Sequence, residues 1–451
     1  MKALLSAPKQ LIIFLTAACL LLFWLTIPIP RIDNQLVGSD GVGYYVYLPS
    51  AILDGDLDFT DEYRYFFAYD PGRVETITKT GRLPANQWPI GPAIFWLPFF
   101  LIAHLLAHLF NLLGAEIPTD GYGYFYQAIV LSGNILYGGA GLLLVYRFAR
   151  EFASSQAVLV SILLVTLAGN LIYYMTAEPS MAHALSLFAS SLFFYVWLKR
   201  RDQPGLKSAA LYGLLGGMMA LIRQQDGLFL ALPFLAQIPD VWRGLTGQTP
   251  NYPWWRWLRD GLVAGMVALL VFSPQLMVWG ILYGDFLHSP YLYTAETPFY
   301  WFTPKLGAVL FSAYRGLFTW HPIFLLAVIG LFLTYRQDKM LALIGFVGLI
   351  IQWYLISAWH VWYQGDAFGG RMFIVATPIF VLGLANLIDW ARNRWSWQVV
   401  YVIGGLLVVW NFLLAVEYRF DLTIANRPPS WYDLTLRRLT FPLELLNRFR
   451  S

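Results

Sequence analysis

The sequence predicts an all-α protein that crosses a membrane with about eleven transmembrane helices. Hydrophobic residues make up 58% of the 451 residues and charged residues only 12%, whereas soluble domains carry about 25% charged residues. The mean hydropathy is +0.56. Apolar runs recur along the whole chain, and many reach the length of about 20 residues that is needed to cross the hydrocarbon layer. Lipid is therefore the expected solvent for most of the chain.

The same composition excludes several classes of protein. The net charge is only +4 and no basic tract is present, so nucleic acid is excluded as a partner. The single cysteine, Cys19, excludes a disulfide framework and a cysteine-based metal site. No P-loop, dinucleotide-binding glycine turn, zinc-protease helix or nucleophile elbow occurs, so an ATP-driven pump or a serine hydrolase has no support.

The first apolar run covers 11–29 and ends in Ile-Pro-Ile-Pro. A cleaved signal peptide would be shorter and would end in small residues, so an uncleaved first span is predicted. Two shorter runs follow in the middle of the chain and flank a polar quartet, Arg223 to Asp226. The predicted spans are, in order, 11–29, 123–146, 156–174, 182–198, 208–222, 227–241, 260–283, 317–335, 340–358, 372–391 and 398–416.

Basic residues near the span ends predict the orientation, because Lys and Arg in short loops stay cytoplasmic. Lys2 and Lys9 place the amino terminus inside. The run 92–113 is also apolar, but if it crossed, every later basic cluster would be inverted. We therefore expect it to be an interfacial or re-entrant helix. The prediction is one transmembrane domain over 1–451, with a long external segment 31–122 and a short external tail 417–451.

Asp40 is the first candidate catalytic residue. It follows the first span by about ten residues, in Gly-Ser-Asp-Gly-Val-Gly-Tyr-Tyr. A carboxylate at the membrane surface among glycines is suited to take a proton from an acceptor hydroxyl, and Tyr44 and Tyr45 are suited to hold a sugar or a phosphate. The alternative is a turn aspartate that caps the next helix. The acidic stretch 54–62 is interpreted mainly as a solvated loop, with a metal site as the alternative.

Glu178 and His183 form the second candidate site, in a very short external connection. Ionisable residues at the edge of a span are usually paired or functional. Five residues apart across a predicted helix start, the two side chains are suited to share a metal ion or a proton. The alternative is that Glu178 is a first-turn acid that the helix dipole favours.

The polar quartet that begins at Arg223 is the third candidate site. The short flanking runs predict that it lies within the outer leaflet, where a guanidinium suits the phosphate of a lipid. An ion pair between Arg223 and Asp226 that braces a helix hairpin is the alternative.

The loop 359–371 is the fourth candidate site, because it combines aromatic residues and glycines with His360, Asp366 and Arg371. Such a composition is typical of a sugar-phosphate pocket. The alternative is interfacial anchoring, with Arg371 reaching toward water. Arg315 and His321 are weaker members of this group. The remaining histidines are interpreted as structural: His104, His108 and His288.

The order of these features resembles the GT-C glycosyltransferases, the membrane superfamily of protein O-mannosyltransferases and the bacterial aminoarabinose–lipid A transferase, and within it glycosyltransferase family 39. The resembling features are an early external Asp40, a Pro-containing interfacial helix from Trp88, Glu178 at an external helix start, and Arg223 at the turn of a short hairpin. Gly369-Gly370-Arg371 before a span looks like the bacterial members. Many relatives carry a basic residue before the proline that opens the interfacial helix, and Gln87-Trp88 stand there in this chain.

The resemblance implies a GT-C-like fold in a bacterial inner membrane, with a periplasmic active site. The donor would be a polyprenyl-phosphate sugar, and the acceptor a hydroxyl of a glycan, lipid or protein, glycosylated with inversion. By analogy Asp40 would be the general base, Glu178 would orient the acceptor or a divalent metal shared with His183, and the other residues would bind donor or substrate: Arg223, Arg371, His360, Tyr44, Tyr45, Trp88 and Asp366.

Two other classes of function fit the same composition. A transporter or flippase of lipid-linked sugars would usually show two related halves with broken helices near the midplane, and the long first external segment argues against that symmetry. A non-catalytic membrane scaffold would tolerate replacement of Asp40 and Glu178 without effect on any transfer.

Overall fold

The computed structural model describes residues 8–28, 35–78, 83–246, 253–293, 298–420 and 427–450. Within these ranges no strand occurs, and one isolated β-bridge pairs Phe299 with Trp359. Seven of the described helices are long and apolar enough to cross a membrane, and three shorter ones are also apolar. The expected all-helical, polytopic membrane protein is thereby confirmed, whereas the count of eleven spans and the orientation stay predictions.

The chain divides into two compact units, which are described separately. The Asp40 unit comprises Ile13–Gly141 and Tyr174–Ala295, and the Arg371 unit comprises Met1–Ile12, Leu142–Tyr173 and Glu296–Ser451.

In the Asp40 unit, α2 (Pro8–Thr26) and α8 (Tyr124–Ala149) are antiparallel neighbours. Near the start of α2, Thr16 packs so closely on Gly139 that a Cβ there would lie 2.3 Å from Thr16 Oγ1. Near its end, the Trp24 indole donates a hydrogen bond to Ser132 at 3.1 Å. The end of α2 and the start of α8 therefore lie at the same end of the unit, and the long segment between them adds no net crossing.

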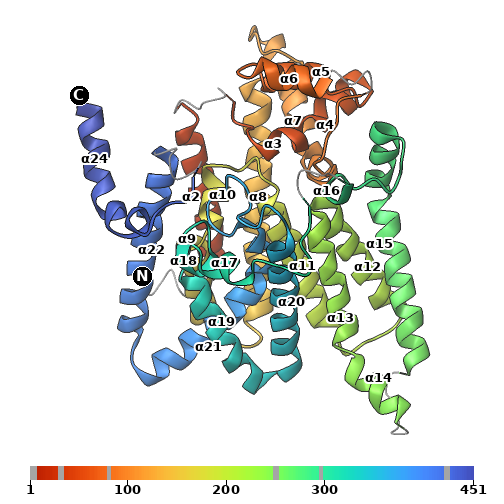
Figure 1. Ribbon diagram of the computed structural model, residues 1–451, viewed down its shortest axis with the longest axis vertical. Coiled ribbons are helices and arrows are strands. Elements are labelled where there is room, and N and C mark those ends of the chain that lie inside the picture. Colours follow the sequence, from red (N-terminus) through yellow and green to blue (C-terminus); the bar gives the residue numbers. More distant parts are fainter. Residues whose placement is uncertain are drawn as a thin grey trace. The chain divides into compact units, whose positions relative to one another are not determined.

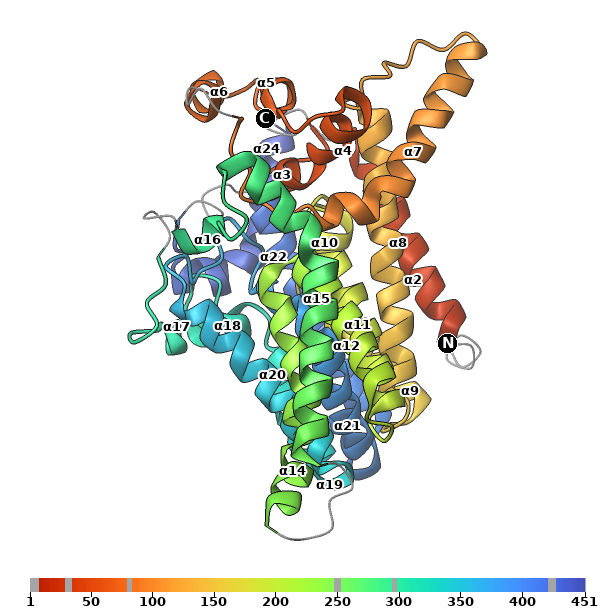
Figure 2. The same ribbon diagram turned by 90° about the vertical axis from the view of Figure 1, so that its right-hand side faces the viewer.

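Helix α7 (Gly91–Leu112) begins beside the middle of α8. The Tyr137 hydroxyl donates to the Phe95 carbonyl at 3.2 Å, and the ring of Phe99 lies on Gly133. From there α7 runs antiparallel to α8 and continues past its start, as Figure 2 shows. This path fits the re-entrant or interfacial helix predicted over 92–113, although α7 is also long enough to cross a membrane. Its depth in a membrane stays a prediction.

The stretch 35–78, which is predicted to be external, folds into short helices at one end of the unit, opposite α14 (Figure 1). Glycines also allow two long helices of this unit to pack closely. Gly213 and Gly217 of α12 lie directly on the backbone of α15. The elements are α3 (Asp40–Tyr45), α4 (Tyr47–Pro49), η1 (Ser50–Asp54), α5 (Thr60–Phe66), α6 (Pro71–Thr78), the end of α10 (Leu171–Thr176), α11 (His183–Arg200), α12 (Leu206–Ile222), η2 (Gln224–Ala231), α13 (Leu232–Leu235), α14 (Ile238–Leu245), α15 (Trp254–Tyr283) and α16 (Pro290–Tyr293).

The run predicted as a span over 227–241 is helical but is not one regular α-helix, and its crossing of a membrane stays a prediction. The chain leaves α12 at Ile222, passes through Arg223 in extended conformation and enters the 3₁₀ helix η2. Pro233 and Pro239 then stand in the first turns of α13 and α14, so the run is split into three short pieces. Proline removes a backbone donor and is accommodated where a helix begins, which explains the divisions.

In the Arg371 unit the backbones of two helices touch, since a Cβ at Gly330 of α19 would lie 1.9 Å from the Gly383 carbonyl of α21. The predicted span 317–335 is interrupted between α18 and α19, at His321-Pro322. The elements are α9 (Ser155–Leu167), α17 (Leu306–Phe311), α18 (Leu317–Trp320), α19 (Ile323–Gln337), α20 (Lys339–Ala358), η3 (Arg371–Ala376), α21 (Thr377–Arg394), α22 (Trp397–Phe420), η4 (Asp433–Arg437) and α24 (Arg438–Arg450).

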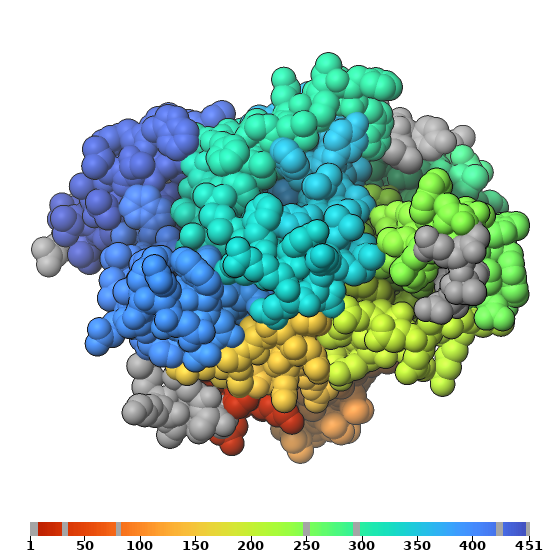
Figure 3. All heavy atoms as spheres, turned by 90° about the horizontal axis from the view of Figure 1, so that it is seen from below, coloured from red at the N-terminus to blue at the C-terminus, as the bar shows by residue number. Residues whose placement is uncertain are grey.

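Three connections of the Arg371 unit reach one face: those between α8 and α9, α19 and α20, and α21 and α22 (Figure 3). The helices that lead into them carry basic residues in their last turns: Arg147, Arg336, Arg392 and Arg394. This clustering is what the positive-inside pattern requires. At the other end, α22 continues to Phe420, so the tail predicted from Glu417 begins inside a helix.

Candidate functional site

Asp40 is the first residue of α3, and the backbone around it is tightly constrained. Ser39 before it has φ 53° and ψ −133°, a conformation that costs a non-glycine residue about 1–3 kcal/mol. A Cβ at Gly41 would lie 2.5 Å from Ser180 Cβ, and one at Gly43 would lie 2.1 Å from the Trp88 ring. Only glycine fits at these two positions. They seat α3 between the 178–181 turn and Trp88, with Asp40 half-buried at its start.

Tyr44 and Tyr45 are the last two residues of α3, and their buried side chains anchor this helix. The Tyr45 hydroxyl donates to the Gly121 carbonyl at 2.8 Å, and the Tyr44 ring meets the edge of Trp96 at a centroid distance of 6.3 Å. Burial raises the pKa of the Tyr45 phenol well above its usual value. These contacts give both tyrosines a packing role, and substrate contact by either one stays a prediction.

Asn86, which the sequence analysis missed, connects α3 with the segment that carries Trp88. Its fully buried amide donates to the Gly43 carbonyl at 2.8 Å and accepts from the Trp88 N–H at 3.1 Å. The Tyr47 hydroxyl donates to the Trp88 carbonyl at 2.9 Å. The half-buried Trp88 ring is thus held by backbone hydrogen bonds on both sides and lies directly against α3.

The turn 178–181 is fixed by Asn134 of α8, a second residue that sequence reasoning missed. The buried Asn134 amide donates to the carbonyls of Pro179 and Met181 at 2.6 and 3.0 Å. Glu178 is half-buried in this connection, and α11 begins only at His183. The alternative of a first-turn acid on α11 is therefore wrong: Glu178 precedes the helix by a full turn.

Arg223 lies against His183, with 2.6 Å between a guanidinium nitrogen and His183 Nδ1. Because a guanidinium only donates, His183 accepts at Nδ1. Among the described residues the hydrogen bonds of Arg223 go to His183 alone, and no ion pair joins it to Asp226. The Asp226 carboxylate accepts instead from Ser186, one turn further along α11, at 2.5 Å. Arg223 and Asp226 still interact electrostatically without a direct contact, and the bracing ion pair stays a prediction.

Three of the four predicted sites thus meet around one short stretch, 178–183. Ser180 contacts Gly41, next to Asp40, and its hydroxyl donates to the Gly38 carbonyl at 3.4 Å. Three residues later His183 holds Arg223. Within the Asp40 unit, the stretch 178–183 therefore fixes both α3, which carries the Asp40 carboxylate, and the guanidinium of Arg223.

The fourth predicted site belongs to the Arg371 unit and is held by Arg315. The fully buried Arg315 donates through Nε to the Ala367 carbonyl at 2.9 Å and lies 3.5 Å from the exposed Asp366 carboxylate. Its guanidinium also covers the Tyr314 ring at 4.6 Å. Arg315 therefore fixes the loop 359–371, whereas the sequence analysis interpreted it only as a weaker member of this candidate site.

Arg371 and His360 differ in exposure. Arg371 is mostly buried at the start of η3, and His360 is exposed. Gln364 has φ 68°, and its side-chain oxygen accepts from the Met372 N–H at 2.8 Å. This hydrogen bond ties the middle of the loop to the start of η3. Joint action of His360, Asp366 and Arg371 with Asp40 stays a prediction.

A divalent metal at Glu178 and His183 also stays a prediction. Within the described ranges, no group of three or more His, Cys, Asp or Glu side chains is arranged to hold an ion. Arg223 occupies His183 Nδ1, so this nitrogen would have to exchange a guanidinium for a metal.

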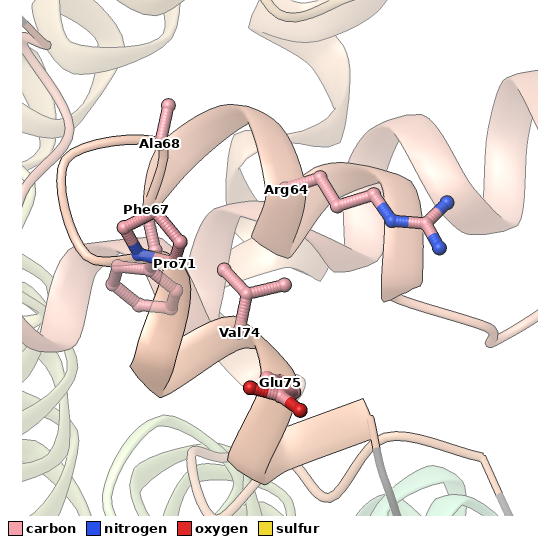
Figure 4. Close-up of a pocket in the computed structure, with 6 residues that line it drawn as sticks. All are labelled: Arg64, Phe67, Ala68, Pro71, Val74 and Glu75. Atoms are coloured by element: carbon pink, nitrogen blue, oxygen red, sulfur yellow. The ribbon is translucent and has the colours of Figure 1, made fainter.

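Two hollows lie away from the predicted residues. One, of about 430 Å³, opens on the external segment beside Phe67, Pro71 and Val74, with the Arg64 side chain extending away from them (Figure 4). The other is an apolar groove of about 490 Å³ along α9 and α22 in the Arg371 unit. Neither is lined by a candidate catalytic residue.

No family model matches the chain, and no curated protein matches it in sequence. Among solved structures the fold is similar to the archaeal oligosaccharyltransferase AglB from Archaeoglobus fulgidus, determined with an inhibitory peptide and a dolichol-phosphate. The TM-score is 0.50 at 12% sequence identity, and the match covers 97% of this chain and 54% of that one. This chain thus spans about half the length of the relative. At 12% identity this likeness shows a similar fold alone, and membership of the GT-C superfamily and of family 39 stays a prediction.

Proposed function

We propose that this protein transfers a sugar from a polyprenyl-phosphate donor to an acceptor hydroxyl on the external side of a membrane, with inversion. The observation that carries the proposal is the 178–183 stretch, which packs against α3 beside Asp40 at one end and holds Arg223 at the other. A carboxylate and a guanidinium are the two charged groups that such a displacement needs. The fold similarity to a protein solved with dolichol-phosphate supports the choice of a lipid phosphate.

In the proposed step Asp40 accepts the proton of the acceptor hydroxyl as its oxygen bonds to the anomeric carbon. The bond from that carbon to the phosphate oxygen breaks, and its electron pair leaves with the polyprenyl phosphate. Because attack and departure occur on opposite faces, the configuration inverts. A positioned general base contributes about 10²–10⁴-fold in rate.

Arg223 balances the charge of the leaving phosphate. One end of its guanidinium rests on His183, which fixes its direction. Its other N–H groups have no partner within the described residues, so they are available for the paired hydrogen bonds that guanidinium makes with phosphate oxygens. Trp88, against α3, offers an aromatic face to the sugar. Glu178 orients the acceptor, and donor binding by Arg371, His360 and Asp366 of the other unit stays a prediction.

The proposal is tested by offering the purified protein a panel of polyprenyl-phosphate sugars and measuring release of free polyprenyl phosphate. Release from one donor by the wild type, with a raised donor KM in Arg223→Gln, is the expected result. Tight binding of one donor without release, even with candidate acceptors present, would favour a flippase. If the protein neither binds nor cleaves any of the donors, the proposed function is contradicted and a scaffold is favoured.

A further inference from the structure

Two histidines on α7 face each other outside the candidate site. His104 and His108 are four residues apart, so they lie on the same face of the helix, one turn from each other. Their Nε2 atoms are 3.2 Å apart, and the ring centroids are 4.6 Å apart with 79° between the planes. His108 is exposed and His104 half-buried. The pair is therefore accessible from outside the protein.

The distance between the Nε2 atoms of His104 and His108 is close to the distance between two nitrogen ligands of one metal ion. With metal–nitrogen bonds of about 2.05 Å, two imidazoles lie about 2.9 Å apart at a right angle and about 3.3 Å apart at the tetrahedral angle. The observed separation falls between these values. The same separation is also within hydrogen-bond range, so in the absence of an ion the two rings share one hydrogen bond, which a bound cation would replace.

Tyr126 of α8 fixes the inner histidine. Its hydroxyl lies 2.7 Å from His104 Nδ1. Tyr126 is fully buried, and its ring also meets Phe100 of α7. When Nδ1–H of His104 donates to this hydroxyl, Nε2 carries the lone pair that points toward His108. Metal-binding histidines nearly always have such a partner on the other ring nitrogen.

We propose that His104 and His108 bind a divalent late transition-metal cation, Zn²⁺ or Cu²⁺, through their two Nε2 atoms, with water completing the coordination. Imidazole suits these ions, and helical histidines at this spacing are a known arrangement for binding them. The site is separate from Glu178 and His183, and it does not depend on the proposed glycosyl transfer.

The experiment uses the full chain in detergent, free of any polyhistidine tag, titrated with Zn²⁺ by calorimetry. One ion per chain is expected for the wild type. His108→Ala should lower the affinity at least tenfold, and its exposed position makes it compatible with folding. Tyr126→Phe should lower the affinity about tenfold, because it removes the partner of His104. The matched control His288→Ala, which changes another histidine, should bind like the wild type.

Two further readouts keep the proposal falsifiable. Electron paramagnetic resonance of bound Cu²⁺ should show two imidazole nitrogens in the wild type and one in His108→Ala. Zn²⁺ should raise the Tm of the wild type but not of His108→Ala, since an ion that binds only the folded state stabilises it. Absence of binding by the wild type, or wild-type affinity in His108→Ala, would overturn the proposal.

Discussion

Glu62 in α5 provides a stability test that depends on a single buried carboxyl group. Its side chain is fully buried, and among the described residues neither oxygen has a hydrogen-bond partner other than the backbone of Glu62 itself. Burial raises the pKa of Glu62 from 4.5 to about 8; a backbone hydrogen bond partly offsets this, and Asp54, Asp56 and Asp61 raise it further. The folded protein therefore keeps this group protonated at neutral pH.

The sign of the pH dependence follows from the raised pKa. Between pH 4.5 and about 8 the folded state holds the proton more tightly than the unfolded chain does. The stabilisation is complete below pH 4.5 and is lost as the pH rises toward 8. The largest slope is about 1.4 kcal/mol per pH unit. Salt that screens the exposed neighbouring carboxylates should narrow the pH window in which this slope applies.

The assay compares thermal unfolding of the wild type and Glu62→Gln in detergent at pH values from 5 to 8. The glutamine keeps the size of the side chain and cannot ionise, so its Tm should fall much less across this window, and the variant should be more stable than the wild type at pH 8. Asp58→Asn is the control, because Asp58 is an exposed carboxylate of the same segment and is not among the groups that raise the pKa of Glu62. Its pH slope should match the wild type. Equal slopes in Glu62→Gln and the wild type would refute the reasoning.

Three further substitutions test the packing around Asp40. Gly43→Ala places a methyl group 2.1 Å from the Trp88 ring; it should cost about 1–3 kcal/mol of stability and lower the kcat for donor cleavage, measured by thermal unfolding and phosphate-lipid release. Asn134→Leu removes both hydrogen bonds to the 178–181 turn; a loss of about 1–3 kcal/mol is expected in the same unfolding assay, and an unchanged Tm would mean that the turn holds itself. Ser186→Ala removes the hydroxyl bonded to the Asp226 carboxylate; Tm should fall, and Asp226→Asn in the same background should restore part of the loss.

The long apolar helices could be predicted from the sequence because long apolar runs suffice to specify them. The bounds of α8, α20 and α22 fall close to the predicted ranges. The exceptions are runs interrupted by proline, such as 227–241, where composition alone does not show whether an apolar stretch forms one helix or several. Asp40, Glu178 and Arg223 could be selected because ionisable residues are rare in such a chain and stand near span ends.

The residues that hold the site together could not be predicted in the same way. Asn86 and Asn134 act through backbone carbonyls more than 40 residues away along the chain. No local sequence pattern around either asparagine predicts which carbonyl it binds, because a buried amide can donate a hydrogen bond to any carbonyl nearby. Tyr45 shows the reverse case: it stands beside Asp40 in the sequence, yet its hydroxyl points to Gly121 in the packed interior.

The most direct test of the central claim compares the kcat for polyprenyl phosphate release in Asp40→Asn and Asp58→Asn. Asp58 is an exposed acid of the same external segment that binds Thr60, and it serves as the matched control. If Asp40 is the general base, Asp40→Asn should lower kcat about 10²–10⁴-fold while donor binding and Tm stay as in the wild type, and Asp58→Asn should release donor normally. Full release by Asp40→Asn would contradict the account.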